Sequence, residues 1–300
     1  MILIDYSQVS LANILAFKKD LASGDSKTIT NLIRHATLST IKSYKKKYGK
    51  EYGELVICCD GRRYWRRDFF EQYKINRKKN REASDLDWHM IFDTLAKIRD
   101  EMIEHFPYRV IHLEECEADD IIAILTKHEN SFDGVLQNED NIFSDKPIMI
   151  VSSDGDFKQL HKWRNVKQYS PILHKMVTVK HSEIKPNLIE HIVKGDSGDG
   201  VPNILSRDEI FTVEERQTPV SSKRLAEFIE NGFDACRNDT ERKNWHRNQT
   251  LVDFEFIPER IQNLIVETFI NTKPKGDKMS IMNYLITNKC RLLLDEIEGF

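Results

Sequence analysis

The sequence has few cysteines, and none of them stands in the spacing of a metal or redox motif. Their number is odd and no two are separated by two residues, so neither a disulfide framework nor a zinc site is indicated. A reducing cytoplasm fits this usage. The five cysteines are Cys58, Cys59, Cys116, Cys236 and Cys290.

Long apolar runs are also missing. The apolar start of the chain, residues 1–4, meets Asp5 at once and is too short for the core of a signal peptide. No other run approaches the length that spans a membrane. We therefore expect a soluble cytoplasmic protein without a membrane partner.

The chain has no large net charge; its formal net charge is −3. It is not a polycation, which argues weakly against nucleic-acid binding, but net charge hides local patches. The charges are segregated along the chain. Residues 62–81 hold nine Lys or Arg and only two acids, and the acids gather elsewhere.

Apolar patterns alternate between strand and helix along the first half of the chain. This alternation is typical of an α/β fold with a mostly parallel central sheet flanked by helices. After residue 182 the pattern indicates a smaller, mainly helical C-terminal region. Strands are predicted at residues 1–4, 54–59, 108–112, 147–152 and 166–169, helices at 29–48, 86–105 and 118–127, and a polar loop at 212–223.

Three aspartates stand just past the ends of predicted strands. They are Asp5, Asp60 and Asp154. Ligands of parallel α/β sheets bind outside the carboxyl ends of the strands. We therefore expect these three carboxylates to meet at one edge of the sheet.

Further acids form local clusters. Each cluster alone is explained more simply as a helix cap or a turn. Together they predict a convergence of carboxylates that needs a counter-charge, and oxygen-only sites suit magnesium or manganese. Two such ions, about 3.5–4 Å apart, can activate a water and stabilise a leaving oxygen in phosphodiester hydrolysis. The clusters are Glu117, Asp119 and Asp120; Asp154 and Asp156; and Asp196 and Asp199.

The basic segment interleaves cations with aromatic residues. Cations bind phosphates and aromatic faces stack on bases, but a solvated helix with its aromatics in the core is an equal alternative. The spacing lets Lys74 and Arg77 point together at a phosphate held by the metals. The candidate nucleic-acid-binding residues are Arg62, Arg63, Arg66, Arg67, Tyr73, Lys74, Arg77, Lys78, Lys79 and Arg81.

Five motifs in order resemble the 5′ nuclease, or flap endonuclease, family, and within it the ribonuclease H group of T-even-type bacteriophages. The motifs are LID, CDGRRYWRRDF, EADD, SSDGDF and KGDSGDGVPN. The resemblance implies a PIN-like nuclease core over residues 1–182, with a basic arch at about 62–85. Residues 183–300 would form a helical DNA-binding region.

By this resemblance the chain is a monomeric, two-magnesium enzyme of the host cytoplasm. It would remove RNA primers from lagging-strand fragments by degrading branched or nicked duplex DNA and RNA–DNA hybrids from the 5′ end and by trimming flaps. A single-stranded-DNA-binding protein and a sliding clamp would be its partners. Manganese could substitute for magnesium.

The resemblance also assigns roles to single residues. Lys74 and Arg77 would lie beside the scissile phosphate, Tyr73 would stack on a base, and Asp5 would stand at the centre of the acids. The acids that hold the tighter metal or its waters would be Asp60, Glu117, Asp119, Asp120 and Asp154. The second metal would take Asp156, Asp196 and Asp199.

One departure concerns potassium. In many members the GDxxDxxP segment runs into a glycine-rich helical hairpin that grips duplex backbone through a potassium ion. Here VPNILSRDEI follows instead, which puts a potassium site in question.

Two other functions stay open: a PIN-like ribonuclease, and a non-catalytic nucleic-acid-binding replication factor. The end of the chain, CRLLLDEIEGF, predicts a closing helix, with a docking peptide as the alternative.

Overall fold

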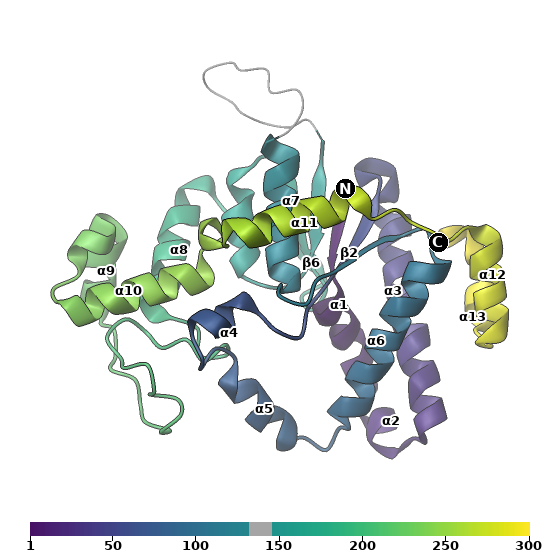
Figure 1. The fold of residues 1–300 in the computed structure, drawn as a ribbon, viewed down its shortest axis with the longest axis horizontal. Helices are drawn as coiled ribbons and strands as arrows, with labels where there is room; N and C mark the ends of the chain where they lie inside the picture. The colour runs from purple at the N-terminus through teal and green to yellow at the C-terminus, as the bar shows by residue number, and fades with distance from the viewer. Residues whose placement is uncertain (132–145) are drawn as a thin grey trace.

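A six-stranded sheet forms the centre of the molecule, in the order β3-β2-β1-β4-β5-β6 (Figure 1). The computed structural model describes residues 1–131 and 146–300, apart from the side chains of residues 78 and 80. All neighbouring strands are parallel except β6, which is antiparallel to β5. The strands are β1 (Ile2–Asp5), β2 (Leu55–Cys59), β3 (Arg109–His112), β4 (Ile148–Val151), β5 (Val166–Ser170) and β6 (Lys175–Val177).

The predicted α/β class is confirmed, and each predicted strand is present within a residue or two of its expected bounds. The strand β6 was not predicted. It has three residues, two of them exposed, so it shows no apolar alternation that the sequence could reveal.

Helices cover both faces of the sheet. Alternate strand residues point to opposite faces, so Ile4 and Ile57 enter one buried cluster while Leu3 and Val56 enter the other. The first face carries α1 (Tyr6–Ile14), α3 (Ser26–Tyr52) and α6 (Trp88–His105), and the second carries α7 (Ala118–Ser131) and α11 (Glu259–Asn271).

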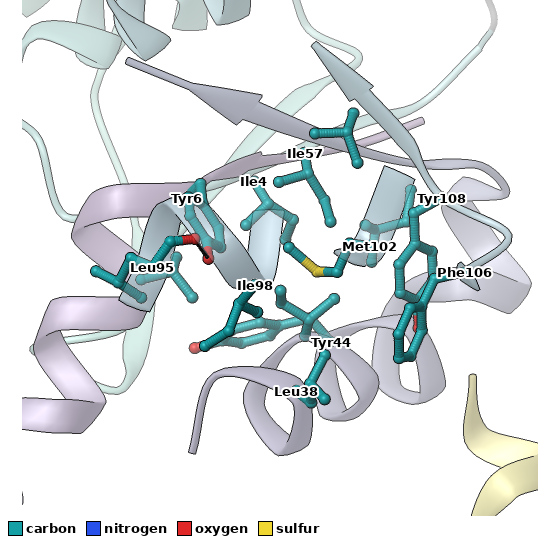
Figure 2. Close-up of a cluster of buried hydrophobic side chains, with 14 of the residues drawn as sticks. Ile4, Tyr6, Leu38, Tyr44, Ile57, Leu95, Ile98, Met102, Phe106 and Tyr108 are labelled. Carbon is teal, nitrogen blue, oxygen red and sulfur yellow. Dashed lines mark hydrogen bonds between the residues drawn. The ribbon is translucent and has the colours of Figure 1, made fainter. Parts of the chain in front are cut away.

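Helix α6 shows how sequence produces this packing. Asp87 caps its start by accepting a hydrogen bond from the Met90 N–H at 2.9 Å. Leu95, Ile98 and Met102 recur at helical spacing and pack toward the sheet (Figure 2). Burying each such side chain contributes about 1.5–3 kcal/mol.

The second half of the chain first leaves the sheet and then returns to it. Helices α8 (His181–Lys194), α9 (Ser222–Asn231) and α10 (Asp239–Val252) share a third cluster with Phe70 and Tyr73. Helix α11 then packs on α7, and α12 (Lys278–Thr287) packs on α6. The remaining elements are α2 (Lys18–Ser23), α4 (Trp65–Phe69), α5 (Ile75–Glu82), α13 (Arg291–Leu294), η1 (Leu15–Phe17), η2 (Asp156–Lys162), η3 (Gly232–Ala235), η4 (Phe254–Phe256) and η5 (Ile297–Gly299).

The end of the chain packs on the first face. The ring of Phe300 meets Phe106 with centroids 5.3 Å apart, and Lys42 pairs with Glu296 at 2.6 Å. This packing suits the predicted closing segment. None of the helices in residues 1–131 and 146–300 is long and apolar enough to cross a membrane. The division of the chain at residue 182 stays a prediction.

Two tyrosines of the first face differ in one respect. Both rings pack on Phe106, but the Tyr284 hydroxyl donates to Glu101 at 2.7 Å and accepts from Arg34 at 2.9 Å. The buried Tyr108 hydroxyl has no partner among the described residues.

We expect Tyr284→Phe to lower the free energy of unfolding by about 1–3 kcal/mol, because Arg34 and Glu101 lose a buried hydrogen-bond partner. Tyr108→Phe is the matched control and should leave it unchanged or slightly higher. Urea denaturation of both variants measures the difference. Equal losses of unfolding free energy in the two variants would show that the hydrogen bonds of the Tyr284 hydroxyl do not stabilise the fold.

Candidate active site

The strand-end aspartates meet at the carboxyl edge of the sheet, as predicted. Strands β2 and β4 flank β1, so the order of the sheet reverses beside Asp5. Asp5 ends β1 and accepts hydrogen bonds from the Gln8 N–H at 3.1 Å and the Ser152 hydroxyl at 3.0 Å. Asp60 accepts from the Ala118 N–H at 2.9 Å, which fixes the start of α7 beside it.

The acids of α7 point in different directions. Glu117 and Asp120 are buried, and the Glu117 N–H donates to Asp120 Oδ2 at 3.0 Å. Asp119 is partly exposed and accepts no hydrogen bond from the described residues. Asp119 therefore faces the open site, whereas its two neighbours face the protein.

Arg66 forms ion pairs with both buried acids. Its guanidinium lies 3.0 Å from Glu117 and 2.7 Å from Asp120, and it donates to the Leu251 carbonyl at 2.8 Å. The side chain is only 3% exposed. Arg66 was predicted to bind nucleic acid, but its charge is paired with buried carboxylates inside the protein. We therefore remove it from the nucleic-acid surface.

Tyr73 is also turned inward. It is 5% exposed, and its hydroxyl lies 3.0 Å from Glu117 and 3.2 Å from Asp199. A buried ring cannot stack on a base, which corrects that expectation for this arrangement. Apolar packing in the cluster with Phe70 explains the placement, as the alternative interpretation of the segment allowed.

Lys74 and Arg77 both reach the acids, and their predicted role at a phosphate stays a prediction. Lys74 has φ +61°, a left-handed conformation that bends the chain into α5. Its ammonium pairs with Glu117 and lies 3.6 Å from Asp199, and the Arg77 guanidinium lies 2.6 Å from Asp199. The two cations thus bridge α7 to the loop that holds Asp199.

The other basic residues of the segment lie outside this cluster. Arg62, Arg63 and Arg67 are exposed. Lys79 pairs with Glu214, and Arg81 lies over the ring of Phe92. The side chain of Lys78 lies outside the described part of the structure.

A histidine that the sequence did not single out holds the far side of the site. The His191 ring lies 3.0 Å from Asp156 and 3.6 Å from Asp196. Burial lowers its pKa, but the two carboxylates prevail and raise the pKa to about 10. His191 is therefore a cation at neutral pH. A lone histidine on an amphipathic helix gives no signal in the sequence.

The carboxylates at the centre of the edge raise one another's pKa. Burial and then Asp60 raise the pKa of Asp5 to about 7, and burial and then Asp156 raise that of Asp154 to about 6. Burial, followed by Asp154 and Asp5, raises the pKa of Asp119 well above its usual range. Asp5, Asp119 and Asp154 have no ion-pair partner among the described residues, and burial and mutual repulsion outweigh the more distant charge of Lys74.

The donor chemistry fits a hard divalent cation, since carboxylate oxygens line a cavity of about 220 Å³. Asp119, Asp154, Asp156, Asp196 and Asp199 lie on its wall. In the described residues, however, no three carboxylate, imidazole or thiol groups converge as a ready-made metal site. Instead, Lys74, Arg77 and His191 form ion pairs with the nearby carboxylates, so a metal ion would have to compete with these side chains.

The whole chain matches two family models. Residues 1–189 match the 5′-3′ exonuclease N-terminal, resolvase-like domain, and residues 182–300 match the T4 RNase H C-terminal domain. The chain belongs to the 5′-3′ exonuclease family. The predicted resemblance is thereby confirmed, and family membership supports a nuclease.

Individual relatives agree with the family. Ribonuclease H of Enterobacteria phage T4 is 35% identical over 308 residues, which cover 99% of this chain and 95% of that protein. Two solved structures of the phage T5 D15 protein share the fold at 16% and 15% identity, with TM-scores of 0.59 and 0.62. Each match covers 90% of this chain, and the matches cover 97% and 99% of the phage T5 chains. The first was co-crystallised with metal ions, and the second is a flap endonuclease complex with DNA and metal ions.

In EDTA, we expect Asp154→Asn to raise the free energy of unfolding by about 1–3 kcal/mol at pH 8 and to leave it nearly unchanged at pH 4. The folded-state pKa is raised from 3.8 to about 6, so the native protein loses stability as pH rises through this window. Asparagine has no proton to lose.

Asp295→Asn, at an exposed carboxylate, is the control and should change neither value. Denaturant titrations at the two pH values give the comparison. A gain for Asp154→Asn that is equal at pH 4 and pH 8 would show that charge repulsion is not its cause.

Proposed function

We propose that this chain is a magnesium-dependent 5′ nuclease that cuts branched or nicked duplex DNA and RNA–DNA hybrids. The observation that carries the proposal is the cluster of Asp5, Asp119 and Asp154, whose carboxylates have no ion-pair partner among the described residues. Asp119 and Asp154 share a cavity with Arg77, and the charge of Lys74 acts on both of them. Carboxylates without ion-pair partners can bind divalent metal ions, and neighbouring basic side chains can bind a phosphate. Metal-assisted phosphodiester hydrolysis uses both.

The carboxylates of the site divide into two groups that could each hold a metal, the second in competition with His191 and Arg77. Asp5, Asp60, Asp119 and Asp154 come from the strand ends and the start of α7. Asp156, Asp196 and Asp199 lie across the cavity. When bound, magnesium or manganese would supply an activated water and a counter-charge for the leaving oxygen. Asp120 faces Arg66, so we propose that it acts by placing Asp119. Glu117, which pairs with Lys74 as well as with Arg66, would meet the metal through a bound water.

Lys74 and Arg77 have a double role in this proposal. Without substrate their charges neutralise Glu117 and Asp199. Once divalent cations satisfy these acids, the ammonium and guanidinium groups become available to a scissile phosphate, whose negative charge grows in the transition state. The proposed catalytic residues are Asp5, Asp60, Lys74, Arg77 and Asp154.

The exposed cations of the basic segment complete a nucleic-acid surface. Arg62, Arg63 and Arg67 are exposed and could meet the phosphate backbone outside the acidic cavity. The phage T4 relative is named a ribonuclease H and the phage T5 neighbour a flap endonuclease. On that basis we propose removal of RNA primers during replication as the biological role. A single-stranded-DNA-binding protein and a sliding clamp are the proposed partners.

A 5′-labelled flap duplex, incubated with the full chain in magnesium or in EDTA, tests the function directly. We expect short labelled products in magnesium alone, because the acids need a divalent cation. The Asp154→Asn variant should bind the duplex without cutting it. Binding of the wild-type chain in EDTA should weaken steeply as salt rises, through counterion release.

The other functions predict different results. Binding without any cleavage in magnesium would leave only a non-catalytic replication factor. Cleavage of single-stranded RNA with no preference for duplex ends or flaps would instead favour a PIN-like ribonuclease. Either outcome would contradict the proposal.

A further inference from the structure

The turn at residues 202–206 follows the loop that carries Asp196 and Asp199. A backbone pair between Asp196 and Val201, with N···O distances of 2.9 and 2.7 Å, closes the loop onto the turn. Gly195 permits this closure, because its φ is +65° and a Cβ there would lie 2.4 Å from the Val201 carbonyl oxygen. A displacement of the turn therefore moves the acids.

The carbonyl groups of the turn accept hydrogen bonds from one face of α10. Asn244 and Asn248, four residues apart on that helix, are fully or almost fully buried. The Asn244 amide donates to the carbonyls of residues 204 and 206 at 3.0 and 2.9 Å. The Asn248 amide donates to the carbonyls of residues 202 and 192 at 2.8 and 2.7 Å.

Arg247 lies between these two amides and is 5% exposed. Its guanidinium donates to the Pro202 carbonyl at 2.8 Å, to the Asn203 carbonyl at 3.3 Å and to Asn248 Oδ1 at 2.9 Å. It also pairs with Asp208. Because a guanidinium cannot be deprotonated in a protein, a positive charge stays fixed among these oxygens.

Inward-facing carbonyl oxygens of this kind also coordinate metal cations. Many members of the family bind a potassium ion after the GDxxDxxP segment, but the residues at this turn do not fit one. The carbonyls of residues 202, 203, 204 and 206 already accept buried hydrogen bonds from α10, and the Arg247 guanidinium lies against the first two of them. An added ion would have to displace a buried guanidinium from Asp208 as well as from the turn.

We propose that Arg247, with Asn244 and Asn248, takes the structural place of a bound monovalent cation and is a positioning residue for Asp196 and Asp199. The chain then holds this side of its site without potassium. Arg247 also lies over the ring of Phe70, 5.6 Å from its centroid, so the same side chain supports the start of the basic segment. Only the consequence for divalent-metal binding rests on the proposed function.

The wild-type chain gives the first test. We expect the same melting temperature, within about 1 °C, in potassium, sodium and choline chloride at equal ionic strength in EDTA. An ion that bound the folded turn would raise the melting temperature with its concentration. A rise specific to potassium would overturn the proposal. This comparison needs neither substrate nor variant.

Arg247→Ala gives the second test, with Arg242→Ala as a matched control on the exposed side of the same helix. We expect the first variant to lower the melting temperature by roughly 5–10 °C, because it removes the buried ion pair with Asp208 and the hydrogen bonds to the carbonyls of residues 202 and 203, and leaves a cavity in their place. Amide hydrogen exchange over residues 196–206 should become at least about tenfold faster, by local opening. Millimolar guanidinium should restore the protection. The control should change none of these quantities.

Arg247→Lys carries the same test if the alanine variant does not fold, since lysine keeps the charge but loses the planar set of donors. Uniformly faster exchange across the whole chain, without guanidinium rescue, would show a role in general stability only. A Mn²⁺ titration of the rescued and unrescued variant adds the functional consequence, with weaker binding expected before rescue. If guanidinium restored the exchange protection but the variant bound Mn²⁺ equally well with and without it, Arg247 would support the turn only. That result would contradict its role in positioning Asp196 and Asp199.

Discussion

Repulsion between carboxylates is the constraint on which the rest of this structure depends. Parallel strands deliver Asp5, Asp60 and Asp154 to one sheet edge, and α7 and the loop after α8 add further acids. Partial burial strengthens the repulsion, because fewer water molecules screen the charges. The cluster can therefore persist only where cations from other parts of the chain reach it.

Those cations connect segments that are far apart in the sequence. Arg66 joins α4 to α7 and, through the Leu251 carbonyl, to the end of α10. Lys74 and Arg77 join the start of α5 to α7 and to the loop of Asp199. His191 joins α8 to η2. The same electrostatic requirement that predicts metal binding thus also determines how the second half of the chain meets the sheet.

The pairs differ in what a divalent cation could do to them. Arg66 is buried on all sides, so exchange of its partners would leave an unpaired charge in the interior, at a cost of about 3–5 kcal/mol. Arg77 is 45% exposed and can turn into solvent or toward a phosphate with little loss. Arg66 therefore holds the framework, while Arg77 is accessible for chemistry.

The sequence predicted the acids better than the bases, for a physical reason. A strand end fixes where an aspartate lies, so Asp5, Asp60 and Asp154 could be placed from the pattern alone. In the basic segment, the five-residue helix α4 is too short to show which face of it is buried, so the pattern does not place Arg66. Tyr73 lies in the turn after that helix, where no periodicity shows which way a ring points. His191 and Arg247 gave no signal, because their partners lie on other segments and only the tertiary structure brings them together.

Anomalous scattering from a crystal soaked in Mn²⁺ would test the central claim most directly. The electrostatics predict two peaks at the sheet edge, one among Asp5, Asp60, Asp119 and Asp154 and one among Asp156, Asp196 and Asp199. Lys74 and Arg77 would have moved away from Glu117 and Asp199. Saturating Mn²⁺ that left both ion pairs intact and gave no peak among these carboxylates would contradict it.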